Sequence, residues 1–262
     1  MDGDFFGRAG ETVDQTLGGR LRIIQKKNGY RFSLDALILA HFTALRERDN
    51  LIDLGTGSGI IALILTKRFR CGRVLGIEIQ EELVELARRN VLLNGLEEEV
   101  EMRRGDVRRP EFFCEPQSFS AAVCNPPYRR LRSGRINPDP EKAVARHEIA
   151  GTVGDFLAAA VYALRPEGRI QMIYPATRMV QLLAEMRNRR IEPKRLRLVH
   201  SRSGGSAAFV LAEGVKGGRE RLNVLPPLII HEEAGGYTRE MTEIFRDLSA
   251  FPAHGGGGSP RS

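Results

Sequence analysis

The segment Asn125-Pro126-Pro127-Tyr128 places an amide, two prolines and a phenol ring directly after an apolar stretch. An amino nitrogen on a base, or an amide nitrogen, is a poor nucleophile because its lone pair is delocalised into the attached π-system. The Asn125 side-chain oxygen and the Pro126 carbonyl are two acceptors that would localise this lone pair and aim it at an electrophile. The prolines supply no competing N–H, and Tyr128 offers a ring for stacking a flipped-out base. The segment predicts group transfer to a planar amino nitrogen; the alternative is a strand exit stiffened by proline.

A glycine loop, DLGTGSG, covers residues 53–59. Gly55, Gly57 and Gly59 remove side chains from alternate positions, so backbone N–H groups at the start of the following helix approach a ligand closely. Glu78 ends the next apolar stretch, 21 residues after Gly57. A carboxylate at that point accepts hydrogen bonds from both hydroxyls of a ribose. The loop and Glu78 together predict a nucleoside cofactor.

The glycine spacing separates two classes of nucleoside cofactor. The dinucleotide fingerprint is GxGxxG, but here the spacing is GxGxG, Ile60 stands where the last glycine belongs, and Asp53 precedes the loop. This favours S-adenosylmethionine over NAD. Asp106 follows the third expected strand, where it would accept a hydrogen bond from an adenine amino group; alternatively it caps a turn.

Strands and helices alternate from residue 50 onward, which positions these segments on one sheet. Expected strands cover residues 51–54, 74–79, 100–104, 119–125 and 169–174, and expected helices cover 60–69, 81–94, 153–164 and 177–189. This alternation predicts a parallel sheet covered on both faces. Three further strands, 195–201, 206–216 and 225–233, have no long helix between them and predict antiparallel pairing. The fold class is therefore α/β: a doubly wound, Rossmann-like, mostly parallel seven-stranded sheet with an antiparallel edge.

The chain divides into three expected parts. Residues 1–48 form a small N-terminal cap, in which residues 19–33 predict a hairpin that turns at Asn28-Gly29 and residues 34–45 predict a helix. Residues 49–250 form the main domain. The tail, residues 251–262, is rich in glycine and is expected to be flexible.

The amino-acid composition indicates which kind of partner and which cellular compartment to expect. The net charge is +7, with six lysines and 34 arginines, which indicates either a polyanionic partner or a codon composition that favours arginine. Cys71, Cys114 and Cys124 have no metal-ligand spacing, so we expect a reducing compartment and no metal. The apolar runs are far shorter than the roughly 20 residues of a membrane span, and the first residues are not those of a signal peptide, so a cytoplasmic protein is expected.

A basic stretch leaves directly from the Asn-Pro-Pro-Tyr segment. Residues 129–148 carry six basic and three acidic side chains. A basic loop beside the acceptor nitrogen would contact phosphates that flank a target base; the alternative is an ordinary solvated connection. The candidate RNA-contacting residues are Arg129, Arg130, Arg132, Arg135 and Arg146.

The sequence strongly resembles the class I methyltransferases that modify planar amino groups, and more narrowly the bacterial tRNA(Val) adenine-N6 methyltransferases. The resemblance rests on GRLRIIQKKNGYRFSLDALILAHF, DLGTGSGIIAL, GIEIQEELVELARRNVLLNG, NPPY, SGRINPDPEKAVARHE and LPPLIIHEE, and it extends over most of residues 17–232. It implies that S-adenosylmethionine is the methyl donor, that S-adenosyl-L-homocysteine is a product, and that residues 125–128 hold the target amino group. The cofactor-binding residues that we predict from the resemblance and the loop together are Asp53, Gly55, Thr56, Gly57, Gly59, Glu78, Ile79, Asp106 and Val107, with Phe32, Ser33 and Asp35 near the methionine end.

Several functions share part of this pattern. The leading hypothesis is methylation of N6 of an unpaired adenosine in tRNA or another structured RNA. A glutamine-N5 protein methyltransferase also uses Asn-Pro-Pro-Tyr, and methylation of rRNA or DNA bases poses the same chemical problem. An NAD-dependent oxidoreductase is disfavoured by the glycine spacing. An RNA-binding module without catalysis would not need Asn125.

Overall fold

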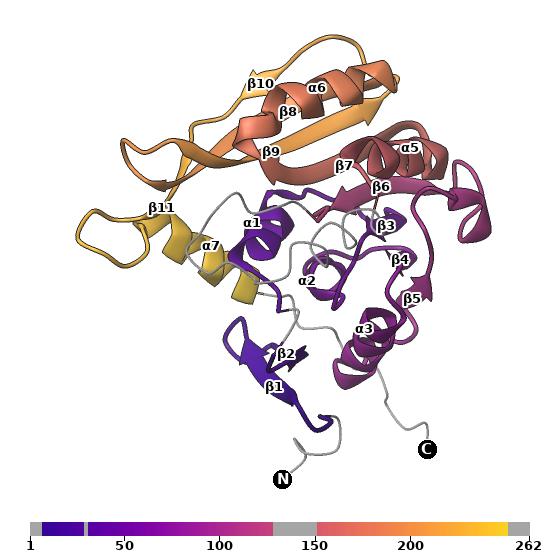
Figure 1. Cartoon of the computed structure of the whole chain (residues 1–262), viewed down its shortest axis with the longest axis vertical. Coiled ribbons are helices and arrows are strands. Elements are labelled where there is room, and N and C mark those ends of the chain that lie inside the picture. Colours follow the sequence, from indigo (N-terminus) through magenta and orange to yellow (C-terminus); the bar gives the residue numbers. More distant parts are fainter. Residues whose placement is uncertain (1–6, 29–30, 128–150, 251–262) are drawn as a thin grey trace, which may run out of the picture.

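Short parallel strands form the centre of the sheet in the computed structural model, which describes residues 7–28, 31–127 and 151–250. Their order is β6 (Phe119–Cys124), β3 (Leu51–Leu54), β4 (Val74–Glu78) and β5 (Val100–Arg104). β3, β4 and β6 are buried along their whole length, because helices cover both faces of the sheet, which is why they are nearly continuous apolar runs in the sequence. The alternation of strands and helices seen in the sequence is confirmed (Figure 1).

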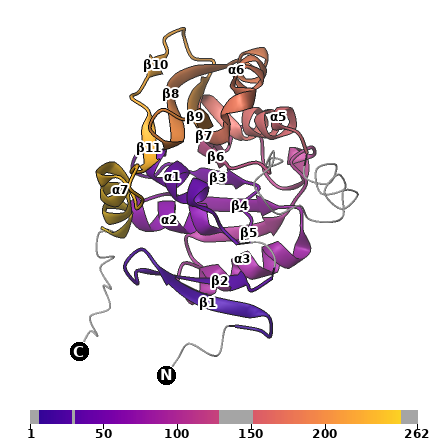
Figure 2. The same cartoon turned by 60° about the vertical axis from the view of Figure 1, so that its left-hand side comes forward.

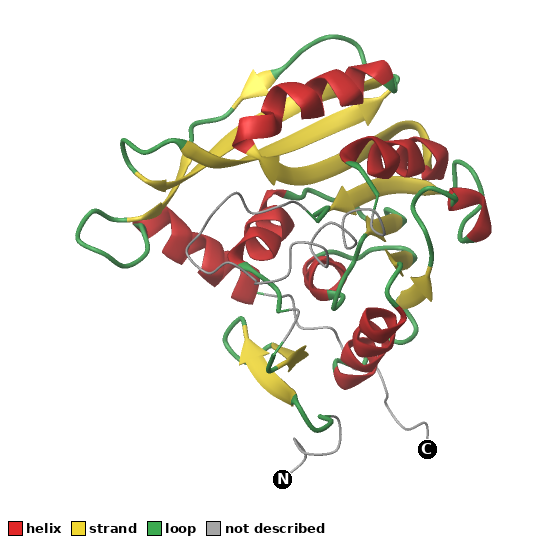
Figure 3. Cartoon of the chain, in the orientation of Figure 1, coloured by secondary structure: helices red, strands yellow, loops and turns green. Residues whose placement is uncertain are grey.

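The other half of the sheet changes direction. β7 (Leu164–Pro175) is parallel to β6, whereas β9 (Ala207–Lys216) is antiparallel to both β7 and β8 (Ile191–Arg202). These long strands lie together at the top of Figure 3. The strands from β8 across to β5 confirm the predicted seven-stranded sheet with an antiparallel edge.

Two further strands extend that edge and correct one expectation. β10 (Asn223–Val224) and β11 (Leu228–His231) both pair with β8, which brings the described sheet to nine strands. The prediction that residues 225–233 pair antiparallel was wrong, because β11 is parallel to β8. β9 ends beside the first residue of β8, with Lys216 opposite Ile191. The chain then crosses to the other side of β8 and runs in the same direction as β8, first as β10 and then as β11.

Helices cover both faces of the sheet (Figure 1). One face packs against α1 (Leu34–Phe42), α2 (Ile60–Arg68) and α7 (Arg239–Ser249), and the other against α5 (Val153–Ala163), the 3-10 turn η2 (Ala176–Arg178) and α6 (Met179–Asn188). A second 3-10 turn, η1 (Pro110–Phe112), follows β5. None of the helices in the described parts of the chain has the length and apolar character needed to cross a lipid bilayer.

The sequence analysis missed α7. Its buried residues Met241, Ile244 and Leu248 recur at the spacing of one helical face, and Thr238 caps its first turn by accepting a hydrogen bond from the Met241 N–H at 3.2 Å. This pattern was present in the sequence and would have identified the helix.

The N-terminal hairpin lies one strand earlier than predicted. β1 (Glu11–Thr16) pairs antiparallel with β2 (Leu21–Lys26), and the turn between them has positive φ at Leu17, Gly18 and Gly19. Residues 31–33 are not a strand, and residues 29–30 lie outside the described residues. The two glycines at the tip satisfy the left-handed turn, so the hairpin closes there and not at Asn28. The hairpin forms its own sheet against α3 (Glu81–Leu93), as Figure 2 shows.

Candidate functional site

The strand register brings the two predicted segments together at the carboxyl edge of the sheet. β3 ends at Leu54, whose register partners are the last residue of β6 and the next-to-last residue of β4. Gly55, Asn125 and Glu78 therefore stand at one level on three neighbouring strands. Such strands are about 4.8 Å apart. In open α/β sheets this edge is where ligands bind.

The backbone of the glycine loop is left-handed at its three glycines. Gly55, Gly57 and Gly59 have φ values of 75°, 59° and 85°, in the left-handed region. A Cβ on Gly55 would lie 3.0 Å from the ring of Phe156, and one on Gly59 would lie 2.9 Å from the methyl group of Met102. Side chains at these positions are therefore opposed both by the backbone and by close packing.

Gly55→Ala tests this packing against a matched control. We expect Gly55→Ala to lower the free energy of unfolding by about 2–4 kcal/mol, because it combines left-handed strain with a contact against Phe156. Gly95→Ala has a similar φ of 62° and no neighbour within 4 Å, so only strain, about 1–2 kcal/mol, is expected. Urea unfolding measures both; equal losses would show that the contact with Phe156 is not tight.

Glu78 is held in place by two backbone donors. Its side chain is buried, and Oε2 accepts a hydrogen bond from the Gly57 N–H at 3.2 Å while Oε1 accepts one from the Gln80 N–H at 3.0 Å. A carboxylate has about four acceptor positions, so two oxygens held in this way retain capacity for ribose hydroxyls. Ile79, the next residue, is half-buried beside it.

Asp53 is fully buried beneath the loop. Its Oδ2 accepts a hydrogen bond from the Thr56 hydroxyl at 2.6 Å, and its Oδ1 has no hydrogen-bond partner in the described structure. Burial raises the pKa of Asp53 to about 7, the negative charge of Glu78 adds to that rise, and the Thr56 hydrogen bond opposes it. Asp53 is therefore a group whose protonation changes near neutral pH.

Asp53→Asn should change how stability depends on pH. The folded state of the original protein holds the Asp53 proton more tightly than the unfolded chain does, because the pKa of about 7 lies above the ordinary 3.8. Its stability should therefore fall as pH rises from about 4 to about 7, by about 1–4 kcal/mol from this group. Asp53→Asn should remove that part of the slope in urea unfolding measured at pH 5 and pH 8; an identical slope would contradict the raised pKa.

Asp106 follows β5 and is already engaged by an arginine. Its carboxylate pairs with the Arg108 guanidinium, with Nη2 to Oδ2 at 2.6 Å, and also accepts the Arg108 backbone N–H at 3.0 Å. The Arg108 side-chain hydrogen bond lowers the pKa of Asp106, so the carboxylate is ionised. The turn-capping role left open by the sequence is therefore present, and the adenine contact stays a prediction. Val107 beside it is buried in the core.

The residues predicted near the methionine end surround the start of α1. The Phe32 N–H donates to the Gln25 side-chain oxygen at 3.1 Å. Ser33 is the N-cap residue, without a side-chain capping bond, and Asp35 is buried in the first turn. α1 packs against α2, the helix that begins at the glycine loop. Their contacts to a cofactor stay predictions.

Asn125 carries the most informative polar atom at this edge. Its Oδ1 is buried and has no hydrogen-bond partner among the described residues. An unpaired buried acceptor costs about 1–3 kcal/mol, and an amino group placed beside it would remove that cost. Pro126 is buried and Pro127 is exposed. The remaining predicted residues, Tyr128, Arg129, Arg130, Arg132, Arg135 and Arg146, lie outside the described residues.

An exposed arginine near this edge was not predicted. β7 is the neighbour of β6, and β7 runs on beyond the level of Asn125 into η2, which ends at Arg178. The position of Arg178 just after the fifth parallel strand would have identified it in the sequence, because side chains there lie at the same edge as the other candidate residues.

A protein-family model and curated relatives both match most of this chain. The family model of the methyltransferase small domain matches residues 33–188. The tRNA1(Val) (adenine(37)-N6)-methyltransferase of Porphyromonas gingivalis is 31% identical over 205 residues, which are 76% of this chain and 80% of that protein. The protein of the same name from a Shewanella species is 25% identical over 224 residues, which are 84% of this chain and 92% of that protein.

Solved structures share the fold at lower identity. A crystal structure described as a predicted O-methyltransferase from Agrobacterium tumefaciens has a TM-score of 0.67 and 24% identity, and the match covers 83% of this chain and 98% of that chain. Geranyl diphosphate C-methyltransferase from Streptomyces coelicolor, solved with S-adenosyl-L-homocysteine, has a TM-score of 0.50 and 15% identity over 69% of this chain and 78% of that chain. The chain therefore belongs to the methyltransferase small-domain family and, among the class I enzymes that use S-adenosylmethionine, to the family of the tRNA(Val) adenine-N6 methyltransferases.

Proposed function

We propose that this protein methylates the exocyclic N6 amino group of an unpaired adenosine in the anticodon loop of a tRNA. The observation that carries the proposal is the buried Oδ1 of Asn125, which has no partner among the described residues and lies beside the glycine loop and two strands from Glu78. An amino group is the donor that such an acceptor lacks. Adenine presents an amino group on a planar ring, and Asn125 is followed by the proline and aromatic residues that suit such a ring.

The residues at the edge fit S-adenosylmethionine. Glu78 accepts from the ribose hydroxyls, Asp106 accepts from the adenine amino group, and the loop at residues 55–59 approaches closely because its glycines have no side chains. Phe32, Ser33 and Asp35 border the methionine end. When bound, the cofactor supplies an electrophilic methyl carbon attached to a sulfonium.

The acceptor nitrogen is activated by orientation. Oδ1 of Asn125 and the carbonyl of Pro126 accept the two N6 hydrogens, which turns the nitrogen lone pair out of conjugation with the ring. Tyr128 stacks on the base. No strong base is needed, because the nitrogen becomes acidic once it carries the methyl group.

The RNA is held through its phosphates. The arginines of the basic loop, Arg129, Arg130, Arg132, Arg135 and Arg146, flank the acceptor turn in the sequence, and Arg178 is exposed near the same edge. An unpaired adenosine is the favoured target because flipping a base out of a duplex costs a few kcal/mol. The choice of valine tRNA rests on the named activity of the Porphyromonas and Shewanella proteins.

Labelled S-adenosylmethionine distinguishes the possible acceptors. The purified protein is incubated with the RNA fraction and, separately, with the protein fraction of cells that lack its gene, with Asn125→Ala as the inactive control. We expect ribonuclease-sensitive label in RNA. Label confined to protein, at a glutamine amide, would overturn the proposal and favour the other chemistry that uses Asn-Pro-Pro-Tyr.

Arg178→Ala should weaken RNA binding through the loss of one phosphate contact. We expect the slope of log affinity against log salt to become shallower by about 0.7, the value for one phosphate of a single strand. Arg219→Ala is the control. Arg219 is exposed just beyond the end of β9, away from the carboxyl ends of the parallel strands. Equal slopes for Arg178→Ala and the original protein would remove Arg178 from the RNA-binding surface.

A further inference from the structure

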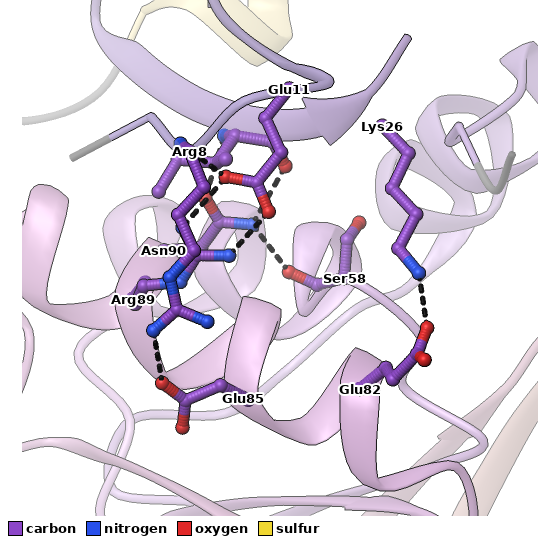
Figure 4. Close-up of polar contacts among 9 residues, drawn as sticks. Arg8, Glu11, Lys26, Ser58, Glu82, Glu85, Arg89 and Asn90 are labelled. Carbon is purple, nitrogen blue, oxygen red and sulfur yellow. Dashed lines mark hydrogen bonds and ion pairs between the residues drawn. The ribbon is translucent and has the colours of Figure 1, made fainter. Parts of the chain in front are cut away.

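A buried asparagine links the N-terminal hairpin to the glycine loop. Asn90 lies on α3 and is fully buried. Its Oδ1 accepts the Ile24 N–H at 2.7 Å, and its Nδ2 donates to the Ile24 carbonyl at 3.2 Å and to the Ser58 carbonyl at 2.9 Å. Figure 4 shows Asn90 beside Ser58 and below the hairpin strands. One side chain therefore contacts both β2 and the loop.

The next residue of β2 contacts the segment that precedes α1. Gln25 is buried, its Oε1 accepts the Phe32 N–H at 3.1 Å, and its Nε2 donates to Asp14 at 2.8 Å. The backbone of Ile24 is thus linked to the glycine loop through the Asn90 amide, and Gln25 bonds through its own amide to the segment that precedes α1. Both of these segments are predicted to hold the cofactor.

The hairpin is fixed firmly enough to act as a support. Glu11 accepts two hydrogen bonds from the Arg89 guanidinium, at 2.6 and 2.7 Å, and both side chains are mostly buried. Lys26 and Glu82 form a further ion pair between the hairpin and α3 (Figure 4). Ile24 also packs in an apolar cluster with leucines of α3. These contacts hold β2 in one position relative to the helix.

We infer that β2 is part of the framework of the cofactor site and that Asn90 is a positioning residue for S-adenosylmethionine binding. The hydrogen bond from Asn90 fixes the orientation of the Ser58 carbonyl. The Ser58 carbonyl and the Gly59 N–H belong to one planar peptide group, so the orientation of the Gly59 N–H is fixed as well. This N–H donates to the Thr56 carbonyl at 2.9 Å. Asn90 therefore holds the loop in its left-handed turn. The inference rests on the proposed placement of the cofactor at this loop.

Asn94, one turn later on α3, is a matched control. Its Oδ1 accepts the Arg22 N–H at 3.1 Å, and its Nδ2 donates to the Arg22 carbonyl at 2.7 Å. The third bond of Asn94 goes to the Asn90 carbonyl, within the helix, and not to the glycine loop. Removing Asn94 therefore removes hairpin contacts and one bond within α3, but no contact with the glycine loop.

Calorimetry with S-adenosylmethionine on the full-length protein separates the two asparagines. We expect Asn90→Ala to raise the Kd for S-adenosylmethionine about tenfold and the KM similarly, with kcat at saturating cofactor within about twofold of the original. Asn94→Ala should leave Kd within about twofold, and urea unfolding shows how much stability each variant loses. Equal effects of the two variants on Kd, or no effect of Asn90→Ala, would overturn the inference.

Two further variants keep the outcome decisive. Gln25→Ala removes the contact to Phe32 and leaves Asn90 in place, and we expect it to raise the Kd for S-adenosylmethionine about threefold or more. If Asn90→Ala fails to fold, an unchanged Kd in Gln25→Ala overturns the inference. Glu78→Ala reports on the cofactor site itself. If Glu78→Ala also leaves Kd unchanged, the placement of the cofactor is wrong; if Glu78→Ala alone weakens binding, only the positioning role of Asn90 and β2 is wrong.

Discussion

Asn125→Ala should lower kcat for methyl transfer by about 10³-fold or more while leaving the affinity for S-adenosylmethionine unchanged. The physical reason is that the Asn125 oxygen orients the acceptor nitrogen and contributes most as the lone pair localises, whereas the cofactor is held by other residues. Single-turnover methylation of RNA and calorimetry of cofactor binding measure the two quantities separately.

Asn125→Asp is the companion variant, because it keeps an acceptor oxygen at the same position. We expect it to retain more activity than Asn125→Ala, since one hydrogen of the amino group still finds a partner. Turnover of Asn125→Ala within about tenfold of the original protein would show that the buried oxygen does not act on the acceptor nitrogen.

Glu78→Ala should raise the Kd for S-adenosylmethionine by about 30- to 100-fold. Two hydrogen bonds from ribose hydroxyls to the carboxylate are lost, and a net contribution of about 1 kcal/mol or slightly more from each gives a change of this size. The Gly57 N–H also loses its hydrogen-bond partner, which loosens the glycine loop. Calorimetric titration of the cofactor measures the change.

Glu81→Ala controls for removing a negative charge nearby. Glu81 begins α3, three residues after Glu78, and forms an exposed ion pair with Arg104 at 3.4 Å. Such surface pairs contribute little, so the cofactor affinity should change by less than about twofold. An unchanged Kd in Glu78→Ala, or an equal change in both variants, would place the ribose elsewhere.

Local sequence signals predicted the centre of the fold well. The apolar runs that became β3, β4 and β6 are short and bounded by glycine or polar residues, and each of β3 and β4 is followed by a helix with its own termination signal. Gly95, predicted to stop α3, has a φ of 62° just after its end. Parallel strands share a carboxyl edge. The prediction that these strands are parallel was therefore enough to place Gly55, Asn125 and Glu78 at one edge of the sheet.

Features that depend on distant contacts were not predictable in this way. β1 is half-exposed and gains its stability from β2 and α3, so its own pattern is weak and the Asn28-Gly29 signal was preferred. The direction of β11 depends on the path of residues 217–227 along the sheet edge. The role of Asn90 requires contacts between residues 66 positions apart in the chain, which no local pattern reveals.

Nucleoside mass spectrometry of valine tRNA tests the central claim most directly. Unmodified valine tRNA is incubated with the protein and S-adenosylmethionine. One part of the product is digested to nucleosides to identify the methylated base, another part is digested to oligonucleotides to locate it, and both are compared with the same reaction of Asn125→Ala. The proposed function predicts one N6-methyladenosine per tRNA, mapped to the anticodon loop, with the original protein and none with the variant. A methyl group on another atom or another nucleotide, or equal product with Asn125→Ala, would contradict it.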